Sequence, residues 1–79
     1  YITGNRIFSI ISVFWWGFMN FADQVKYVRI KLHLSQVDFA KLMGVNFTTV
    51  NRWENGKTEP SYKALRNFEI ICKEHQITF

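Results

Sequence analysis

The feature that most restricts the fold of this chain is a pair of short helical patterns separated by one glycine. Ser35 is a good N-cap residue, and Phe39, Ala40 and Met43 follow at the spacing of one helix face. Gly44 ends this pattern, because a sharp turn after a helix requires a residue that tolerates positive φ. We therefore expect a short helix that ends at Met43 and a tight turn directly after it.

A second short helix is expected directly after the turn, over about residues 46–54. Asn46 is a good N-cap, Val50 and Trp53 share one apolar face, and the pattern ends before Gly56. Two short helices joined by a tight glycine turn form a helix-turn-helix, in which the second helix can enter the major groove of DNA. The face opposite the apolar stripe carries Phe47, Thr48, Asn51 and Arg52.

Helical patterns also flank this pair. Val25, Val28 and Leu32 recur at three and four residues, which predicts a first helix over about 22–32. Ser61 is a good N-cap for a last helix. The inward face of that last helix is expected to carry Leu65, Phe68, Ile71 and Cys72. The predicted fold class is therefore all-α: a compact bundle of four to five short helices that contains a helix-turn-helix, preceded by an extra apolar N-terminal segment.

Length, charge and cysteine content narrow the class of protein. With 79 residues the chain is expected to form one domain, and its formal net charge of +4 is compatible with a nucleic-acid partner. The single cysteine excludes a disulfide framework, and Cys72-x-x-His75 lacks the second ligand pair that structural zinc needs. No Gly-rich phosphate loop, carboxylate pair or nucleophile–base set occurs in the sequence. We therefore expect no enzyme activity, no metal and no cofactor.

Residues 1–21 differ in composition from the rest of the chain. They hold half of the aromatic side chains and one charged residue, Arg6. The apolar run over 7–18 is shorter than the roughly 20 residues that span a bilayer, so no membrane span is expected. We divide the chain into an apolar aromatic segment over 1–21 and a helix-turn-helix domain over 22–79.

Three interpretations of the N-terminal segment stay open. Residues 7–18 could complete the core or form a dimer contact, or they could associate with a membrane surface. They could also be a non-native extension, since Met19 stands at the change in composition. The lone reduced Cys72 and the absence of a clear signal sequence predict a cytoplasmic protein.

A set of spaced residues carries a family resemblance. It reads Gln36-x-x-Phe39-Ala40-x-x-x-Gly44-Val45-x-x-x-x-Val50-x-x-Trp53-Glu54-Asn55-Gly56-Lys57-x-x-Pro60. With its flanks, from about Ala22 to Phe68, this pattern resembles the Cro/repressor-like helix-turn-helix family, also called the xenobiotic-response-element family. The resemblance implies a λ-repressor-like bundle whose reading helix covers about 46–54. It also implies a homodimer that binds two-fold-related half-sites on double-stranded DNA, commonly to repress transcription.

The resemblance also implies roles for residues outside the exposed face of the reading helix. Gln36 matches a residue that holds a phosphate group, and Arg29 and Glu54 match a partly buried structural ion pair. The loop after the reading helix matches one that lies along the sugar-phosphate backbone. The predicted phosphate contacts in this loop are Asn55, Lys57 and Thr58. Asn46, the N-cap at the other end of the reading helix, is a further predicted phosphate contact.

Four side chains on the exposed face of the reading helix are candidates for contact with base edges. Arg52 can bond to guanine with two hydrogen bonds, Asn51 can bind adenine or a phosphate, and Thr48 can donate or accept. The ring of Phe47 can pack on a thymine methyl group. The alternative for Phe47 is contact with Thr58 or with the N-terminal segment of the same chain.

These residues favour a sequence-specific DNA-binding protein that regulates, and commonly represses, transcription. One alternative is the DNA-binding domain of an antitoxin-type autorepressor, in which a helix-turn-helix is also followed by one long terminal helix. Another is a protein-interaction module that uses the same fold without DNA. DNA binding is favoured over this last alternative by four polar side chains expected on one side of the domain, namely Gln36, Thr48, Arg52 and Lys57.

Overall fold

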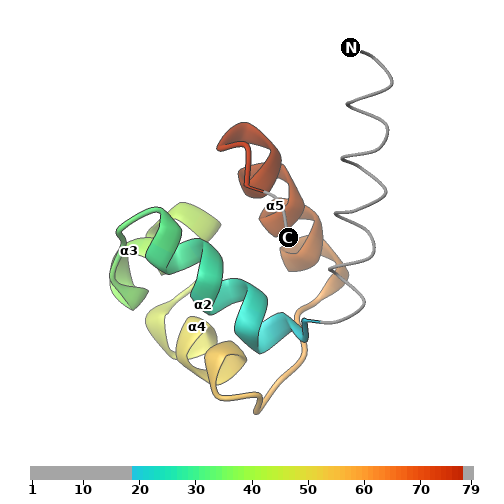
Figure 1. The fold of residues 1–79 in the computed structure, drawn as a ribbon. Helices are drawn as coiled ribbons and strands as arrows, with labels where there is room; N and C mark the ends of the chain where they lie inside the picture. The colour runs from blue at the N-terminus through green and yellow to red at the C-terminus, as the bar shows by residue number, and fades with distance from the viewer. Residues whose placement is uncertain (1–18, 78–79) are drawn as a thin grey trace.

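The computed structural model describes residues 19–77, and in this range the protein is built from helices. Four of them follow one another: α2 (Phe21–Lys31), α3 (Gln36–Met43), α4 (Phe47–Glu54) and α5 (Tyr62–Glu74) (Figure 1). This range contains no strand, which confirms the predicted all-α fold. None of the four helices is long and apolar enough to cross a membrane. The interpretations of residues 1–18 lie outside the described residues.

Each of these helices begins after a residue whose side chain caps it. In every case a side-chain oxygen accepts a hydrogen bond from the backbone N–H three residues further on, which satisfies a free donor of the first turn. The capping residues of α2 to α5 are Asn20, Ser35, Asn46 and Ser61. Because Asn20 is a cap that the sequence pattern did not predict, α2 begins at Phe21, slightly before the expected start at residue 22.

Each of the four helices of the described part is followed, within two residues of its end, by a residue in the left-handed conformation. These residues are His33, Gly44, Gly56 and Gln76, with φ of 59°, 73°, 69° and 56°. After α3 the Gly44 N–H donates to the Lys41 carbonyl at 3.2 Å, and the Val45 N–H donates to the Ala40 carbonyl at 3.0 Å. This Schellman arrangement satisfies carbonyl groups of the last helical turn. It produces the tight turn between α3 and α4.

The hydrophobic core receives side chains from all four helices. Leu65, which was expected to face inward, is only half-buried, because Ala64 and Phe68 occupy the centre of the buried face of α5. The other predicted inward positions are buried as expected. The buried apolar side chains are Val25, Val28, Phe39, Ala40, Met43, Val50, Trp53, Ala64, Phe68, Ile71, Cys72 and Ile77.

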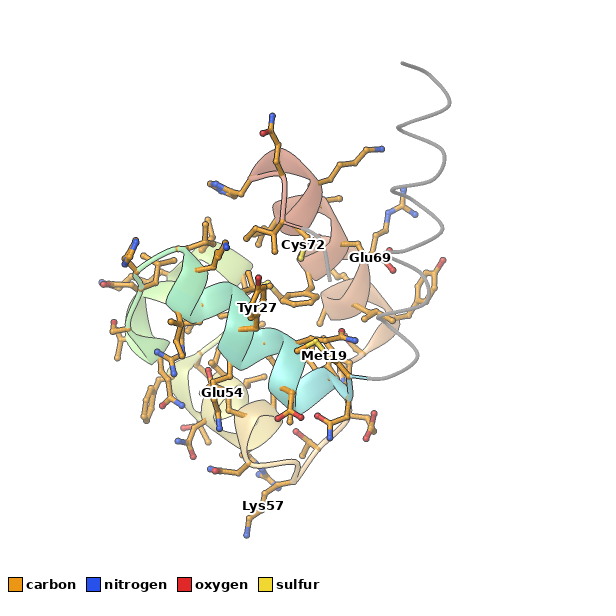
Figure 2. The ribbon with its side chains drawn as sticks, in the orientation of Figure 1. Met19, Tyr27, Glu54, Lys57, Glu69 and Cys72 are labelled. Atoms are coloured by element: carbon orange, nitrogen blue, oxygen red, sulfur yellow. The ribbon has the colours of Figure 1, made fainter. Side chains whose placement is uncertain are left out.

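Phe21 connects the start of α2 to this core. Its ring meets Trp53 edge-on, with 5.4 Å between centroids, and meets Phe68 at 5.2 Å. Before it lies Met19 (Figure 2). The Met19 carbonyl accepts a 2.7 Å hydrogen bond from the buried Gln24 amide. Met19 and Phe21, at the end of the segment set apart by composition, therefore contact the helical bundle.

Candidate nucleic-acid interface

The outward face of α4 does not pack against the rest of the described protein. α3 and α2 both pack against α4 (Figure 1), and its Val50 and Trp53 are 0 % and 3 % exposed. On the opposite side of the helix, Phe47, Thr48 and Arg52 are exposed. The fold therefore holds α4 by its apolar stripe and presents three of the four predicted base-contacting side chains to solvent.

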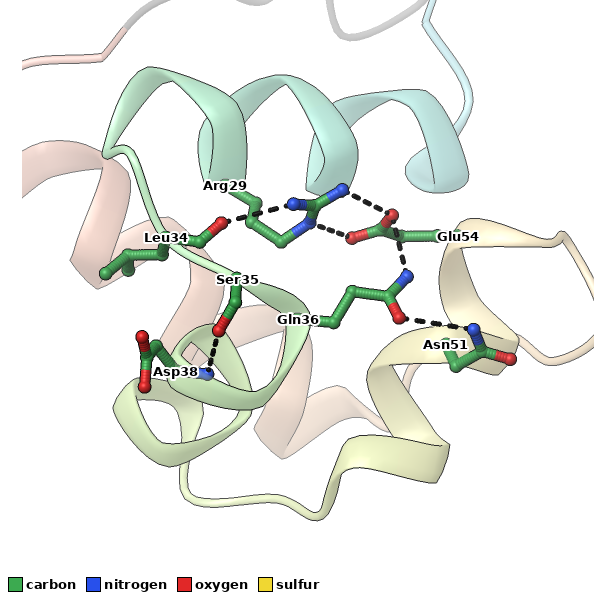
Figure 3. Close-up of polar contacts among 7 residues, drawn as sticks. All are labelled: Arg29, Leu34, Ser35, Gln36, Asp38, Asn51 and Glu54. Carbon is green, nitrogen blue, oxygen red and sulfur yellow. Dashed lines mark hydrogen bonds and ion pairs between the residues drawn. The ribbon is translucent and has the colours of Figure 1, made fainter.

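An ion pair connects α2 to the C-terminal end of α4 (Figure 3). The Arg29 Nε donates to Glu54 Oε2 at 2.6 Å, and its Nη2 donates to Glu54 Oε1 at 3.1 Å. The Arg29 Nη1 also donates to the Leu34 carbonyl at 3.1 Å. The hydrogen bond with the Glu54 carboxylate raises the pKa of Arg29 above its ordinary value, against the lowering effect of partial burial. The pair that the resemblance implied is therefore formed, and it ties two crossing helices together.

Three of the side chains predicted to contact DNA are hydrogen-bonded to one another. Gln36 Nε2 donates to Glu54 Oε1 at 3.1 Å, and Gln36 Oε1 accepts from Asn51 Nδ2 at 3.2 Å (Figure 3). Asn51 Oδ1 in turn accepts from Asn55 Nδ2 at 3.2 Å. Gln36 and Asn51 are half-buried, whereas Asn55 is exposed. The three amides thus form one network that starts at the carboxylate of Glu54.

Only part of this network has a signal in the sequence. Asn51 and Asn55 are four residues apart, and side chains at that spacing meet on a helix surface. Gln36 and Asn51 are 15 residues apart, and their contact depends on how α3 lies against α4. No local pattern predicts such a contact, so the roles assigned to Gln36 and Asn51 from the sequence did not include it.

The remaining predicted phosphate contacts lie at the two ends of α4. Asn46 precedes the helix, and its Oδ1 accepts from the Thr49 N–H at 3.2 Å and from the Thr49 hydroxyl at 2.8 Å. Lys57 is exposed in the loop after α4 (Figure 2), and Thr58 beside it is half-buried. The left-handed Gly56 starts this loop. Candidates for backbone contact therefore flank the exposed face of α4 at both ends.

Metal and thiol chemistry have little support in the described part of the chain. Residues 19–77 contain no group of three His, Cys, Asp or Glu side chains placed to hold a metal ion. Cys72 is a free, buried thiol, and burial is the main cause that raises its pKa from 9.0 to about 12. A thiol of such high pKa is protonated at neutral pH and is a poor nucleophile.

Two short helices joined by a glycine turn, of which the second presents polar side chains to solvent, define a helix-turn-helix domain. A family model described as helix-turn-helix matches residues 25–72, which is more than half of the chain. The protein belongs to this family, the Cro/repressor or xenobiotic-response-element type of helix-turn-helix domain. The family consists of DNA-binding domains of transcription regulators and is not an enzyme family. The match confirms the resemblance seen in the sequence. No match was found among curated proteins or solved structures.

Proposed function

We propose that this domain binds specific sites on double-stranded DNA with α4 in the major groove and represses transcription from those sites. The observation that carries the proposal is the exposure of Phe47, Thr48 and Arg52 on a helix that Val50 and Trp53 fix in the core. A major groove admits one α-helix, and side chains on its outward face reach base edges. In this arrangement Arg52 bonds to guanine, Phe47 packs on a thymine methyl group, and Thr48 contributes a further hydrogen bond.

Contacts with the DNA backbone complete the proposed interface. Gln36 is the first residue of α3, where free backbone N–H groups and the helix dipole favour an anion such as a phosphate. Asn55, Lys57 and Thr58 follow α4, and Asn46 precedes it. Contacts of this kind set the position and orientation of the protein on the duplex, whereas base contacts set its sequence preference. The formal net charge of +4 supports the same partner.

A homodimer on two-fold-related half-sites is part of the same proposal, and the family resemblance supports it. Two copies of α4 would then enter successive major grooves about 34 Å apart, or roughly 10 base pairs centre to centre. A duplex selected from a random library should accordingly contain two inverted half-sites at that spacing. A single asymmetric site bound by one chain would overturn the dimer and leave the reading helix in place.

The proposal is tested by measuring affinity for the selected duplex over a series of salt concentrations. Arg52→Ala should lose about 1–3 kcal/mol of discrimination at one base pair, because it removes a base contact. Lys57→Ala should weaken binding about equally for all sequences and reduce the salt slope by about 1. Arg66→Ala, which removes an exposed charge from α5, is the matched control and should change neither base preference nor affinity beyond a small general effect.

Two results would contradict the proposal. If the domain binds no duplex even at low salt, the alternative of a protein-interaction module is favoured. If duplex binding persists unchanged in Arg52→Ala and Lys57→Ala, DNA contacts another face of the domain.

A further inference from the structure

We infer that Asn51 is a positioning residue that aims the amides of Gln36 and Asn55 at the DNA backbone and does not itself read a base. This inference rests on the proposed function and concerns one face of the same interface. It follows from the order in which the hydrogen bonds run from the carboxylate of Glu54 to the surface.

The direction of each hydrogen bond is set by the one before it. An ionised carboxylate only accepts, so Gln36 must turn its Nε2 toward Glu54 Oε1. The Gln36 Oε1 then faces Asn51, which must present Nδ2 to it. The Asn51 Oδ1 consequently faces Asn55 and accepts from its Nδ2. A single charged group therefore selects one of two amide orientations at each of three successive side chains.

The starting point of this chain of bonds is rigid. The side chain of Glu54 is 3 % exposed, and both of its oxygens accept from the guanidinium of Arg29. Arg29 also donates to the Leu34 carbonyl, so the guanidinium that binds the carboxylate is itself fixed between Glu54 and the segment that leads into α3 (Figure 3). The orientation that Glu54 imposes on Gln36 is therefore set within the protein, before DNA binds.

The network leaves free donors at its two outer members. An amide group has two N–H donors, and Gln36 and Asn55 each use one of them within the protein. The second N–H of each remains for a phosphate oxygen, and Gln36 stands at the N-terminus of α3, where a phosphate is favoured. Pre-orientation lowers the entropy lost when these side chains bind.

Asn51 itself is badly placed to recognise adenine. That recognition uses the oxygen and the N–H of one amide together, facing the same base edge. In Asn51 the oxygen already accepts from Asn55 and the nitrogen already donates to Gln36. Asn51 is also half-buried, whereas Arg52 next to it is exposed. The side chain therefore serves the network, and the exposed face of α4 is left to its neighbours.

The test is a mutant cycle in affinity for the selected duplex. In the wild-type background Asn51→Ala should weaken binding roughly three- to tenfold, equally for all sequences, as expected for the loss of hydrogen-bonded positioning. In a Gln36→Ala/Asn55→Ala background the same substitution should leave affinity unchanged, because the residues through which Asn51 acts are gone. An equal loss in both backgrounds, or a changed preference at one base pair, would overturn the inference. Asn67→Ala on α5 is the matched control for the substitution.

A measurement on the wild-type protein keeps the inference testable if Asn51→Ala does not fold. In the side-chain amide region of an NMR spectrum of the free protein, Gln36, Asn51 and Asn55 should each show one slowly and one rapidly exchanging N–H. Two rapidly exchanging N–H groups on Gln36 or Asn51 would overturn the network as an orienting device.

Failure of the inference and failure of the proposed function have different signatures. If Arg52→Ala and Lys57→Ala weaken duplex binding as expected and Asn51→Ala acts independently of its partners, only the inference is wrong. If none of these substitutions affects duplex binding, the interface itself is wrong and the inference falls with it.

Discussion

The guanidinium of Arg29 and the carboxylate of Glu54 lie 2.6 Å apart, although 25 residues separate them along the chain. The Glu54 side chain is 3 % exposed and that of Arg29 is 19 % exposed. A carboxylate buried this deeply depends on its partner, because an unpaired buried charge is costly. The same carboxylate also holds Gln36, so the pair supports both the helix crossing and the polar side of the proposed interface.

Removal of the arginine should therefore destabilise the fold strongly. Arg29→Ala leaves Glu54 buried without its cation, and we expect a loss of about 3 kcal/mol or more in the free energy of unfolding. Urea denaturation followed by circular dichroism measures it. Arg66→Ala, an exposed arginine on α5, is the control and should change stability by less than about 0.5 kcal/mol. Similar small losses in both variants would show that the ion pair is not important for stability.

Replacement by alanine should reduce stability strongly at one phenylalanine and only slightly at another. Phe68 is fully buried and contacts the rings of Phe21 and Phe39, so Phe68→Ala should cost roughly 3–5 kcal/mol of stability through the cavity it leaves. Phe47 is 46 % exposed on α4, so Phe47→Ala should change stability by less than about 1 kcal/mol. Thermal and urea unfolding of both variants check this contrast. A large loss in Phe47→Ala would mean that its ring packs within the protein.

The four left-handed helix ends predict changes of opposite sign. His33 and Gln76 adopt φ of 59° and 56° with a side chain present, so His33→Gly and Gln76→Gly should each raise stability by roughly 0.5–1 kcal/mol. Gly44→Ala should lower it by roughly 1 kcal/mol through backbone strain alone, since no atom lies within 4 Å of the added Cβ. Chemical denaturation of the three variants gives the signs. Destabilisation by His33→Gly and Gln76→Gly would show that those side chains make stabilising contacts.

The proposed thymine contact of Phe47 can be tested by removing only the methyl group from the DNA. Replacing a contacted thymine by deoxyuridine should weaken wild-type binding roughly fourfold, as expected for the loss of one buried carbon. The Phe47→Ala variant should bind both duplexes equally. Thymines outside the protected region of the duplex serve as controls. If the wild-type protein shows no methyl dependence at any thymine, Phe47 has another role.

The buried thiol predicts a dependence of stability on pH. The pKa of Cys72 is raised from 9.0 to about 12, so the folded protein keeps a proton that the unfolded chain releases above about pH 9. The stability linked to this proton is complete below pH 9 and falls as the pH rises toward 12. The Cys72→Ala variant has no thiol and therefore lacks this contribution to stability. The difference in free energy of unfolding between wild type and Cys72→Ala, measured by urea titration between about pH 8 and pH 10.5, should therefore decrease with rising pH. A difference that stays constant would contradict the raised pKa.

Local interactions explain what was predictable from the sequence. The caps Ser35, Asn46 and Ser61 act on N–H groups three residues away, and the turn at Gly44 closes over its own helix end. The apolar stripe formed by Val50 and Trp53 follows from the period of a single helix. These short-range rules were sufficient for the all-α fold and for the exposed face of α4.

Only the tertiary structure decided which distant residues meet. Phe21 packs against Trp53 of α4 and Phe68 of α5 because the start of α2 lies beside both side chains, a contact that the composition of residues 1–21 did not predict. Gln36 and Asn51 meet because α3 packs against α4, at a separation that no helical period encodes. The sequence by itself thus determined the four helices, most of their ends, and the exposure of Phe47, Thr48 and Arg52 on the reading helix. The crossing of the helices determined the polar network behind that face, because a side chain can be oriented only by groups that packing brings within hydrogen-bonding distance.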